Sequence, residues 1–80
     1  MKILIVEDEE KLAKSIYDFL KKEENLDCDL AFTYSDGLKK IQNTQYDCTI
    51  LDITLPDGNG LNIIKYLKED YPNTGILIIS

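Results

Sequence analysis

The chain has 80 residues, of which 44% are hydrophobic and 30% charged, a balance typical of one small globular domain or of part of one. Its net charge of −6 argues against direct contact with nucleic acid, because that affinity depends on neutralising phosphates. No histidine is present, which excludes histidine-ligated zinc and catalysis by serine–histidine or cysteine–histidine pairs within the chain.

The first expected element is a strand over residues 2–6. Its apolar run is continuous and rich in β-branched residues, which indicates a strand buried on both faces, as in a parallel sheet. Four acids, Glu7 to Glu10, follow it directly. The next apolar residues recur at helical spacing and share one face of an expected helix: Leu12, Ile16, Phe19 and Leu20.

A second strand is expected over residues 27–32, where apolar residues alternate weakly, and it is assigned to an edge of the sheet. Thr33 or Ser35 can cap the helix that follows. This helix is expected to run to residue 42 and to turn Leu38 and Ile41 inward.

The third strand is expected over residues 46–51 and again ends on an acid, Asp52. Residues 54–60 read Thr-Leu-Pro-Asp-Gly-Asn-Gly and are expected to form a loop because of their proline and glycine content. A third helix follows, with apolar residues close to one face: Leu61, Ile64, Leu67 and Tyr71. Pro72 ends it, and residues 75–80 form a fourth, apolar strand.

Strands and helices therefore alternate along the chain with short connections. This order predicts an α/β fold, a doubly wound parallel sheet with helices on both faces and right-handed crossovers. There is no internal repeat and no linker that would mark a second domain, so residues 1–80 are treated as one unit.

Acidic side chains follow two strands of this expected sheet. Glu7 and Asp8 follow the first strand and Asp52 follows the third. If these strands are neighbours, their carboxyl ends lie about 5 Å apart, and three carboxylates then crowd one small volume. Such acids can simply be solvated strand ends. They can also share Mg2+, which prefers oxygen ligands, and an aspartate beside Mg2+ can accept a phosphoryl group.

At this point the residues resemble the receiver domain of two-component response regulators. Residues 3–9 (Ile-Leu-Ile-Val-Glu-Asp-Glu) are similar to its first strand and acidic pair. Residues 50–61 are similar to its phosphoacceptor segment, with proline four and glycine eight residues beyond the acid. Residues 76–80 are similar to its fourth strand and terminal hydroxyl residue. The resemblance implies a flavodoxin-like sheet with strand order 2-1-3-4.

The resemblance also implies roles for individual residues. Asp52 resembles the phosphoacceptor, which a sensor histidine kinase phosphorylates, and it also contacts the metal. Asp8 resembles the direct Mg2+ ligand, and Glu7 the second acid, which acts on the metal through water. Thr54 resembles the position whose backbone carbonyl completes the metal shell. Ser80 resembles the switch hydroxyl that bonds the phosphoryl group.

The family domain continues through a fourth helix, a fifth strand that carries a lysine, and a fifth helix, and no residue here matches that lysine. We therefore expect a truncated receiver. Its fourth strand would be an uncovered apolar edge that pairs with a second copy, or the chain would be poorly folded. The sequence of residues 55–60 is most similar to that of regulators with a winged-helix DNA-binding output domain. The parent protein is therefore expected to be a transcriptional regulator.

The sequence also allows other interpretations of the function. The chain can be a signalling-incompetent fragment that acts as an assembly or folding module. An aspartate-nucleophile phosphohydrolase is a poorer reading, because Thr54 stands where that class needs a second acid, and we do not expect an enzyme. A calcium loop around residues 57–59 fails on ligand spacing.

The expected location is the cytoplasm, without membrane contact. The longest apolar runs, such as residues 3–6 and 76–79, are far shorter than the about 20 residues that a spanning helix needs, and no charged-then-apolar leader opens the chain. Cys28 and Cys48 form no CxxC motif and are expected to fill space in a reducing compartment. The family's strand order would separate them by one strand.

Overall fold

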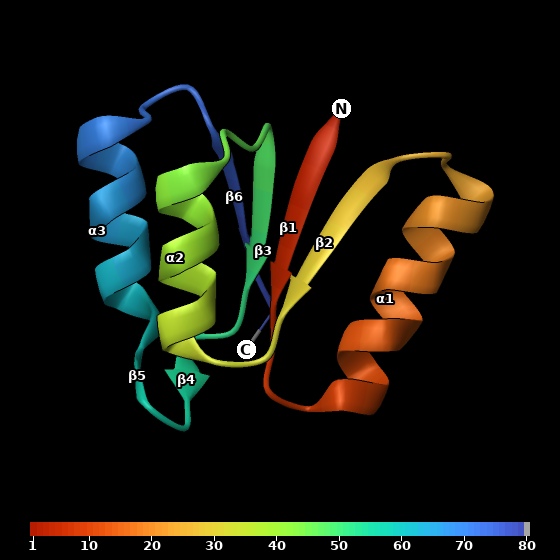
Figure 1. Ribbon diagram of the computed structural model, residues 1–80, viewed down its shortest axis with the longest axis horizontal. Coiled ribbons are helices and arrows are strands. Elements are labelled where there is room, and N and C mark those ends of the chain that lie inside the picture. Colours follow the sequence, from red (N-terminus) through yellow and green to blue (C-terminus); the bar gives the residue numbers. More distant parts are fainter. Residues whose placement is uncertain (80) are drawn as a thin grey trace.

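Four strands form one parallel sheet in the computed structural model, which describes residues 1–79 (Figure 1). The strands are β1 (Lys2–Val6), β2 (Asp27–Ala31), β3 (Cys48–Leu51) and β6 (Gly75–Ile78). Their order is β2-β1-β3-β6, with every pair parallel. This confirms the flavodoxin-like order 2-1-3-4, in which the fourth expected strand is β6, and it confirms the edge position of β2.

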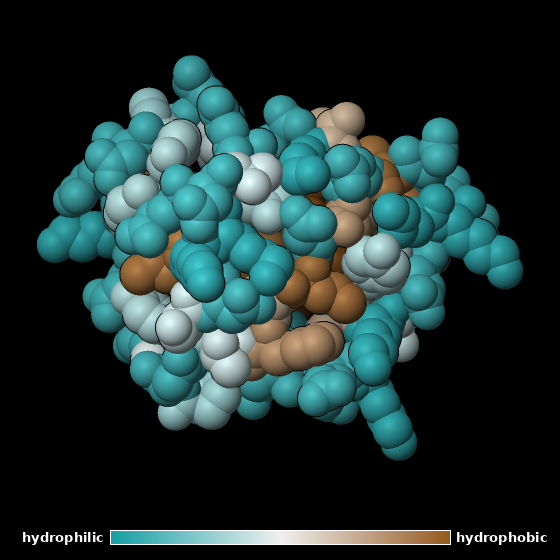
Figure 2. All heavy atoms as spheres, in the orientation of Figure 1, coloured by the Kyte–Doolittle hydropathy of each residue, from teal (hydrophilic) through white to brown (hydrophobic). Residues whose placement is uncertain are grey.

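Three helices cover the two faces of the sheet. Figure 1 shows α1 (Glu10–Glu23) on one face, and α2 (Tyr34–Asn43) and α3 (Gly60–Asp70) side by side on the other. On the face drawn in Figure 2, hydrophilic residues cover the outer surfaces of the helices, and apolar residues gather between α1 and α2, over the sheet. None of the helices in residues 1–79 combines the length and the apolar character needed to cross a bilayer.

The alternation of side chains along β1 builds two hydrophobic cores. Leu4 and Val6 face α2 and α3, whereas Ile3 and Ile5 face α1. The continuous apolar run of β1 is thus explained by burial on both faces. Cys28 pairs with Ile3 on one side of β1, and Cys48 pairs with Ile3 on the other, so one strand separates the two cysteines, and both thiols are free.

The faces expected for α1 and α3 are confirmed in part. Ile16 and Leu20 of α1 pack against the core as partly buried residues, as expected. On α1, Leu12 and Phe19 are 40% and 58% exposed, while Ala13 is fully buried. On α3, Leu61 is 52% exposed and Ile63 is fully buried. Ala13 and Gly60, small residues next to the exposed leucines, are buried instead. Ile64 and Tyr71 pack against the core as partly buried residues, and Leu67 is buried as expected.

Residues 54–60 are not an irregular loop as expected. They contain a small antiparallel hairpin of β4 (Thr54–Leu55) and β5 (Gly58–Asn59), with Leu55 opposite Gly58. Pro56 takes the first central position of the two-residue turn, where its fixed φ is favourable. Leu55 is 6% exposed and anchors the hairpin in the core.

The N-cap of α2 is one of the two residues expected from the sequence. The Thr33 side chain accepts a hydrogen bond from the Asp36 backbone N–H, which selects Thr33 over Ser35 as the N-cap of α2. At the end of α1, Asn25 adopts a φ of 53°, and the Leu26 N–H donates a hydrogen bond to the Leu20 carbonyl. This left-handed residue ends the helix and directs the chain into β2.

Candidate functional site

The acidic residues after β1 and β3 are brought together by the pairing of these two strands. Val6 lies opposite Leu51, the last residue of β3. The Asp52 N–H then donates to the Val6 carbonyl at 2.9 Å, and the Glu7 N–H donates to the Ala31 carbonyl at 3.0 Å. The sheet hydrogen bonds thus fix the backbone of both acids at the carboxyl edge of the sheet, where ligands bind in folds of this kind.

Three carboxylates converge at this edge. One oxygen each from Glu7, Asp8 and Asp52 lies within 4.8 Å of the others, so the three predicted acids do share one small volume. Glu7 and Asp52 are buried, with 4% and 6% of their surfaces exposed, and Asp8 is exposed. The cluster therefore has two buried members and one that opens to solvent, a suitable arrangement for a hydrated cation.

The electrostatics of the cluster show that three negative charges are costly there. Burial raises the pKa of Glu7 from its ordinary value of 4.5 to about 7, and hydrogen bonds with Asp52 and Asp8 favour the same protonated form. The Glu9 backbone N–H, 3.5 Å from the Glu7 carboxylate, opposes this rise of the pKa. A proton on Glu7 or a bound cation would offset this cost.

The segment after Asp52 folds back on it. The Thr54 N–H donates to Asp52 Oδ1 at 3.1 Å, and the Gly60 N–H donates to the Ile53 carbonyl at 2.6 Å. A Cβ at position 60 would lie 2.5 Å from the Asp52 carbonyl oxygen, so only glycine fits this close approach. The hydrogen bond from the Thr54 N–H holds this residue, the expected backbone ligand, beside Asp52. Thr54 is an exposed residue.

The expected switch hydroxyl, Ser80, lies outside the described residues, and its role stays a prediction. The Ile79 N–H donates to the Leu51 carbonyl at 3.1 Å. This bond continues the pairing of β3 and β6 to the edge that carries Asp52.

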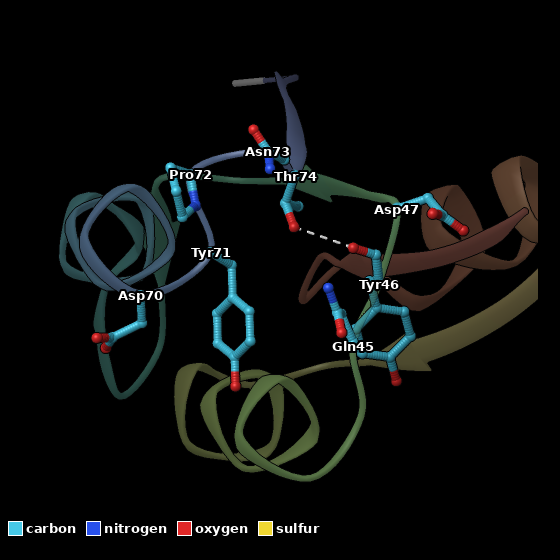
Figure 3. A pocket seen from close by; sticks show the side chains of 8 residues that line it. All are labelled: Gln45, Tyr46, Asp47, Asp70, Tyr71, Pro72, Asn73 and Thr74. Atoms are coloured by element: carbon cyan, nitrogen blue, oxygen red, sulfur yellow. Dashed lines mark hydrogen bonds between the residues drawn. The ribbon is translucent and has the colours of Figure 1, made fainter.

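Two hollows among residues 1–79 lie away from these acids. One has a volume of about 320 Å³. Figure 3 shows Tyr71 and Gln45 on its two sides, and the Thr74 hydroxyl there donates to the Tyr46 carbonyl at 3.0 Å. This hollow is formed by the segments that lead into β3 and β6, at the end of the sheet opposite to the acids. The second is an apolar groove of about 400 Å³ between α1 and β6. Glu7, Asp8 and Asp52 line neither of these two hollows.

Comparison with known proteins agrees with the arrangement of this site. The family model described as "Response regulator receiver domain" matches residues 3–80. The response regulator ArlR of Staphylococcus saprophyticus is 40% identical over 79 residues, which are 99% of this chain and 35% of that protein. The transcriptional regulatory protein DltR of Streptococcus agalactiae is 38% identical over 80 residues, with 100% and 35% covered. The chain thus spans about 35% of the length of these relatives.

Solved structures share the fold. A CheY-like response regulator receiver domain protein from Methanospirillum hungatei superposes with a TM-score of 0.90 at 28% identity, covering 96% of this chain and 61% of that one. The response regulator TrrA from Thermotoga maritima, solved in complex with Mg(2+)-BeF, has a TM-score of 0.88 at 30% identity, with 96% and 66% covered.

Proposed function

The chain belongs to the receiver domain family of two-component response regulators, and from this premise we propose that Asp52 accepts a phosphoryl group from a partner histidine kinase in a reaction that needs Mg2+. One observation carries the proposal: carboxylate oxygens of Glu7, Asp8 and Asp52 lie within 4.8 Å of one another at the carboxyl edge of the sheet. The family identity supplies the reaction, and this cluster supplies its acceptor and its cation site.

The residues present fit Mg2+ well. The cluster offers hard oxygen donors, and burial raises the pKa of Glu7, so a cation that stabilises its ionised form would be favoured there. Asp8 and Asp52 would hold the ion directly, Glu7 through water, and Thr54 through its backbone carbonyl. Once bound, the ion would neutralise charge on the transferred phosphoryl group. The related TrrA structure is a complex with Mg(2+)-BeF, which supports the same choice of ion for this chain.

The proposed step makes one bond and breaks one. An Asp52 carboxylate oxygen attacks phosphorus, and the phosphorus–nitrogen bond of the donor phosphohistidine breaks, with the electron pair kept by the imidazole. The Thr54 N–H on Asp52 Oδ1 and the backbone bond from Asp52 to Val6 orient the acceptor before transfer. Ser80 would bond the phosphoryl oxygens afterwards and so read the modified state.

The test uses the wild-type chain with Mg2+ and a small acyl phosphate as donor. We expect intact-mass spectrometry to show the gain of one phosphoryl group, and no gain when the metal is chelated. An unchanged mass at saturating donor and Mg2+ would contradict the proposal.

The rest of the function is proposed from the relatives. The chain covers 61% and 66% of the two solved proteins described above, which supports its assignment as the N-terminal portion of a receiver domain. The matched relatives are response regulators and transcriptional regulatory proteins, so we propose a cytoplasmic transcriptional regulator whose DNA contacts lie outside these residues. Phosphorylation of Asp52 would then alter the output of that regulator.

Self-association of the 80-residue chain is a further part of the proposal. Among residues 1–79, no strand pairs with the outer edge of β6. Leu77 and Ile78 on this strand are 54% and 47% exposed, and Leu77 also lines the apolar groove beside α1. An apolar strand edge pairs readily with an identical one, so we propose that two copies join their β6 edges. This would make the chain an assembly module as well.

Replacing Leu77 with Lys is expected to disrupt that dimer, because a charge on an edge strand opposes pairing. Leu61→Lys is the matched control, since Leu61 is 52% exposed on α3 and lies outside β6. Size-exclusion chromatography with light scattering should show a concentration-dependent dimer for the wild type and for Leu61→Lys, and a monomer for Leu77→Lys. A wild-type monomer at high concentration would refute the proposed pairing.

A further inference from the structure

The turn of the β4–β5 hairpin bonds to the start of α2. Oδ1 of Asp57 accepts the Tyr34 backbone N–H at 2.7 Å, and Oδ2 accepts the Ser35 N–H at 3.0 Å. The two partners precede Asp57 by 23 and 22 positions, so this is a contact between separate elements and not a local turn. These two bonds lower the pKa of Asp57, because they stabilise its carboxylate form.

Asp57 completes the set of hydrogen bonds at this helix end. Thr33 serves the next two donors, since its side chain accepts the Asp36 N–H and its carbonyl accepts the Gly37 N–H. The first two N–H groups of α2 would have no acceptor within the helix, and the carboxylate of Asp57 supplies both. A negative charge at a helix N-terminus is also favoured by the helix dipole. The bond pair is therefore well placed to hold the two elements together.

Packing reinforces the same junction. A Cβ at position 58 would lie 2.5 Å from the Tyr34 ring, so that ring rests directly on the backbone of the hairpin. Leu55 holds the other side of the hairpin in the core. The hairpin is thus fixed from the inside by Leu55 and from the outside by the contacts of Asp57 and Gly58 with the first turn of α2.

The same hairpin begins at the site. Thr54 pairs with Asn59 and Leu55 with Gly58, so strand pairing links the turn to the first residue of β4. The Thr54 N–H is the donor to Asp52 Oδ1. We infer that Asp57 is a positioning residue, which ties the hairpin to α2 and thereby sets where Thr54 presents its backbone to Asp52. This inference rests on the proposed function only in taking Asp52 as the reacting residue.

The test compares Asp57→Ala with Thr33→Ala. Both remove acceptors from the first turn of α2, but only Asp57→Ala releases the hairpin. Amide hydrogen exchange of the metal-free protein is followed by NMR, with the Ile5 amide as the reference for global opening. We expect exchange at Thr54 to rise about tenfold over this reference in Asp57→Ala, as for the loss of a charge-assisted hydrogen bond. In Thr33→Ala only the first turn of α2 should change.

Asp57→Asn should give an intermediate rate at Thr54, because its amide oxygen can still accept one of the two N–H groups. Equal acceleration at Thr54 in Asp57→Ala and Thr33→Ala, or none in Asp57→Ala, would show that Asp57 is only a helix cap and would overturn the inference. A separate Mg2+ titration of the wild type decides the proposed function. Absence of any response there would refute the metal site, while the exchange data would still decide the role of Asp57.

Discussion

Replacing Asp52 with Asn is expected to abolish phosphoryl incorporation completely. The amide has nearly the shape of the carboxylate, and its oxygen can still accept the Thr54 N–H that now bonds Asp52 Oδ1. It is neutral, however, and cannot form a stable acyl phosphate. The measurement is the intact mass after incubation with Mg2+ and an acyl phosphate.

Asp18→Asn is the matched control, because Asp18 is an exposed acid on α1 and the substitution removes the same charge. This variant should gain one phosphoryl group as the wild type does. Treatment with hydroxylamine should remove the group, since it cleaves acyl phosphates. If Asp52→Asn is still phosphorylated in a hydroxylamine-sensitive way, another carboxylate is the acceptor and the assignment is wrong.

The metal-free protein is expected to lose stability as the pH rises from about 4.5 to about 7, because of Glu7. Its pKa is near 7 in the folded chain and 4.5 as the ordinary value, so in this range the native state binds more protons than the unfolded state. The stabilisation by the protonated form is complete below the lower pKa and is lost as the pH passes the higher one. The free energy of unfolding should therefore decline between these two pH values.

Urea unfolding at a series of pH values, with and without the substitution Glu7→Gln, measures this effect. Gln cannot ionise, so the decline between the two pKa values should disappear in that variant. Glu69→Gln, an exposed acid at the end of α3, is the control and should keep the decline. Equal pH profiles for Glu7→Gln and the wild type would show that burial of Glu7 does not govern the stability.

Mg2+ should oppose the loss of stability with rising pH in the wild type. The ion binds the ionised carboxylates, so its affinity should rise with pH up to about 7, and its binding should release protons below that value. The same cluster thus links phosphorylation chemistry to stability, because both depend on how its negative charge is compensated.

The sheet and the convergence of the acids could be predicted from the sequence. The continuous apolar run of β1 indicates a parallel strand buried on both faces, and the apolar end of β3 at Ile50 and Leu51 indicates another. Such strands end at one edge of the sheet. Acids placed directly after these runs must therefore meet if the strands are neighbours. The sequence did not show that Glu7 is buried and Asp8 exposed, which follows from the direction of each side chain after the strand.

The faces of the helices were less predictable. In α1, the neighbours Leu12 and Ala13 both belong to plausible apolar faces, and the structure buries Ala13 and leaves Leu12 40% exposed. The contact of Asp57 with Tyr34 and Ser35 left no signal in the sequence, because it joins elements more than twenty residues apart. The hairpin of β4 and β5 was missed because proline and glycine indicate a turn but not whether its flanks pair.

The most direct test of the central claim is a titration of the wild-type chain with Mg2+, followed by NMR at the backbone amides of Asp8, Asp52 and Thr54. We predict saturable changes that fit one site and centre on these three residues, and their loss in Asp8→Asn. Weak, unsaturated changes spread over exposed acids such as Glu23 and Glu24, with none at Asp52, would contradict a cation site formed by Glu7, Asp8 and Asp52.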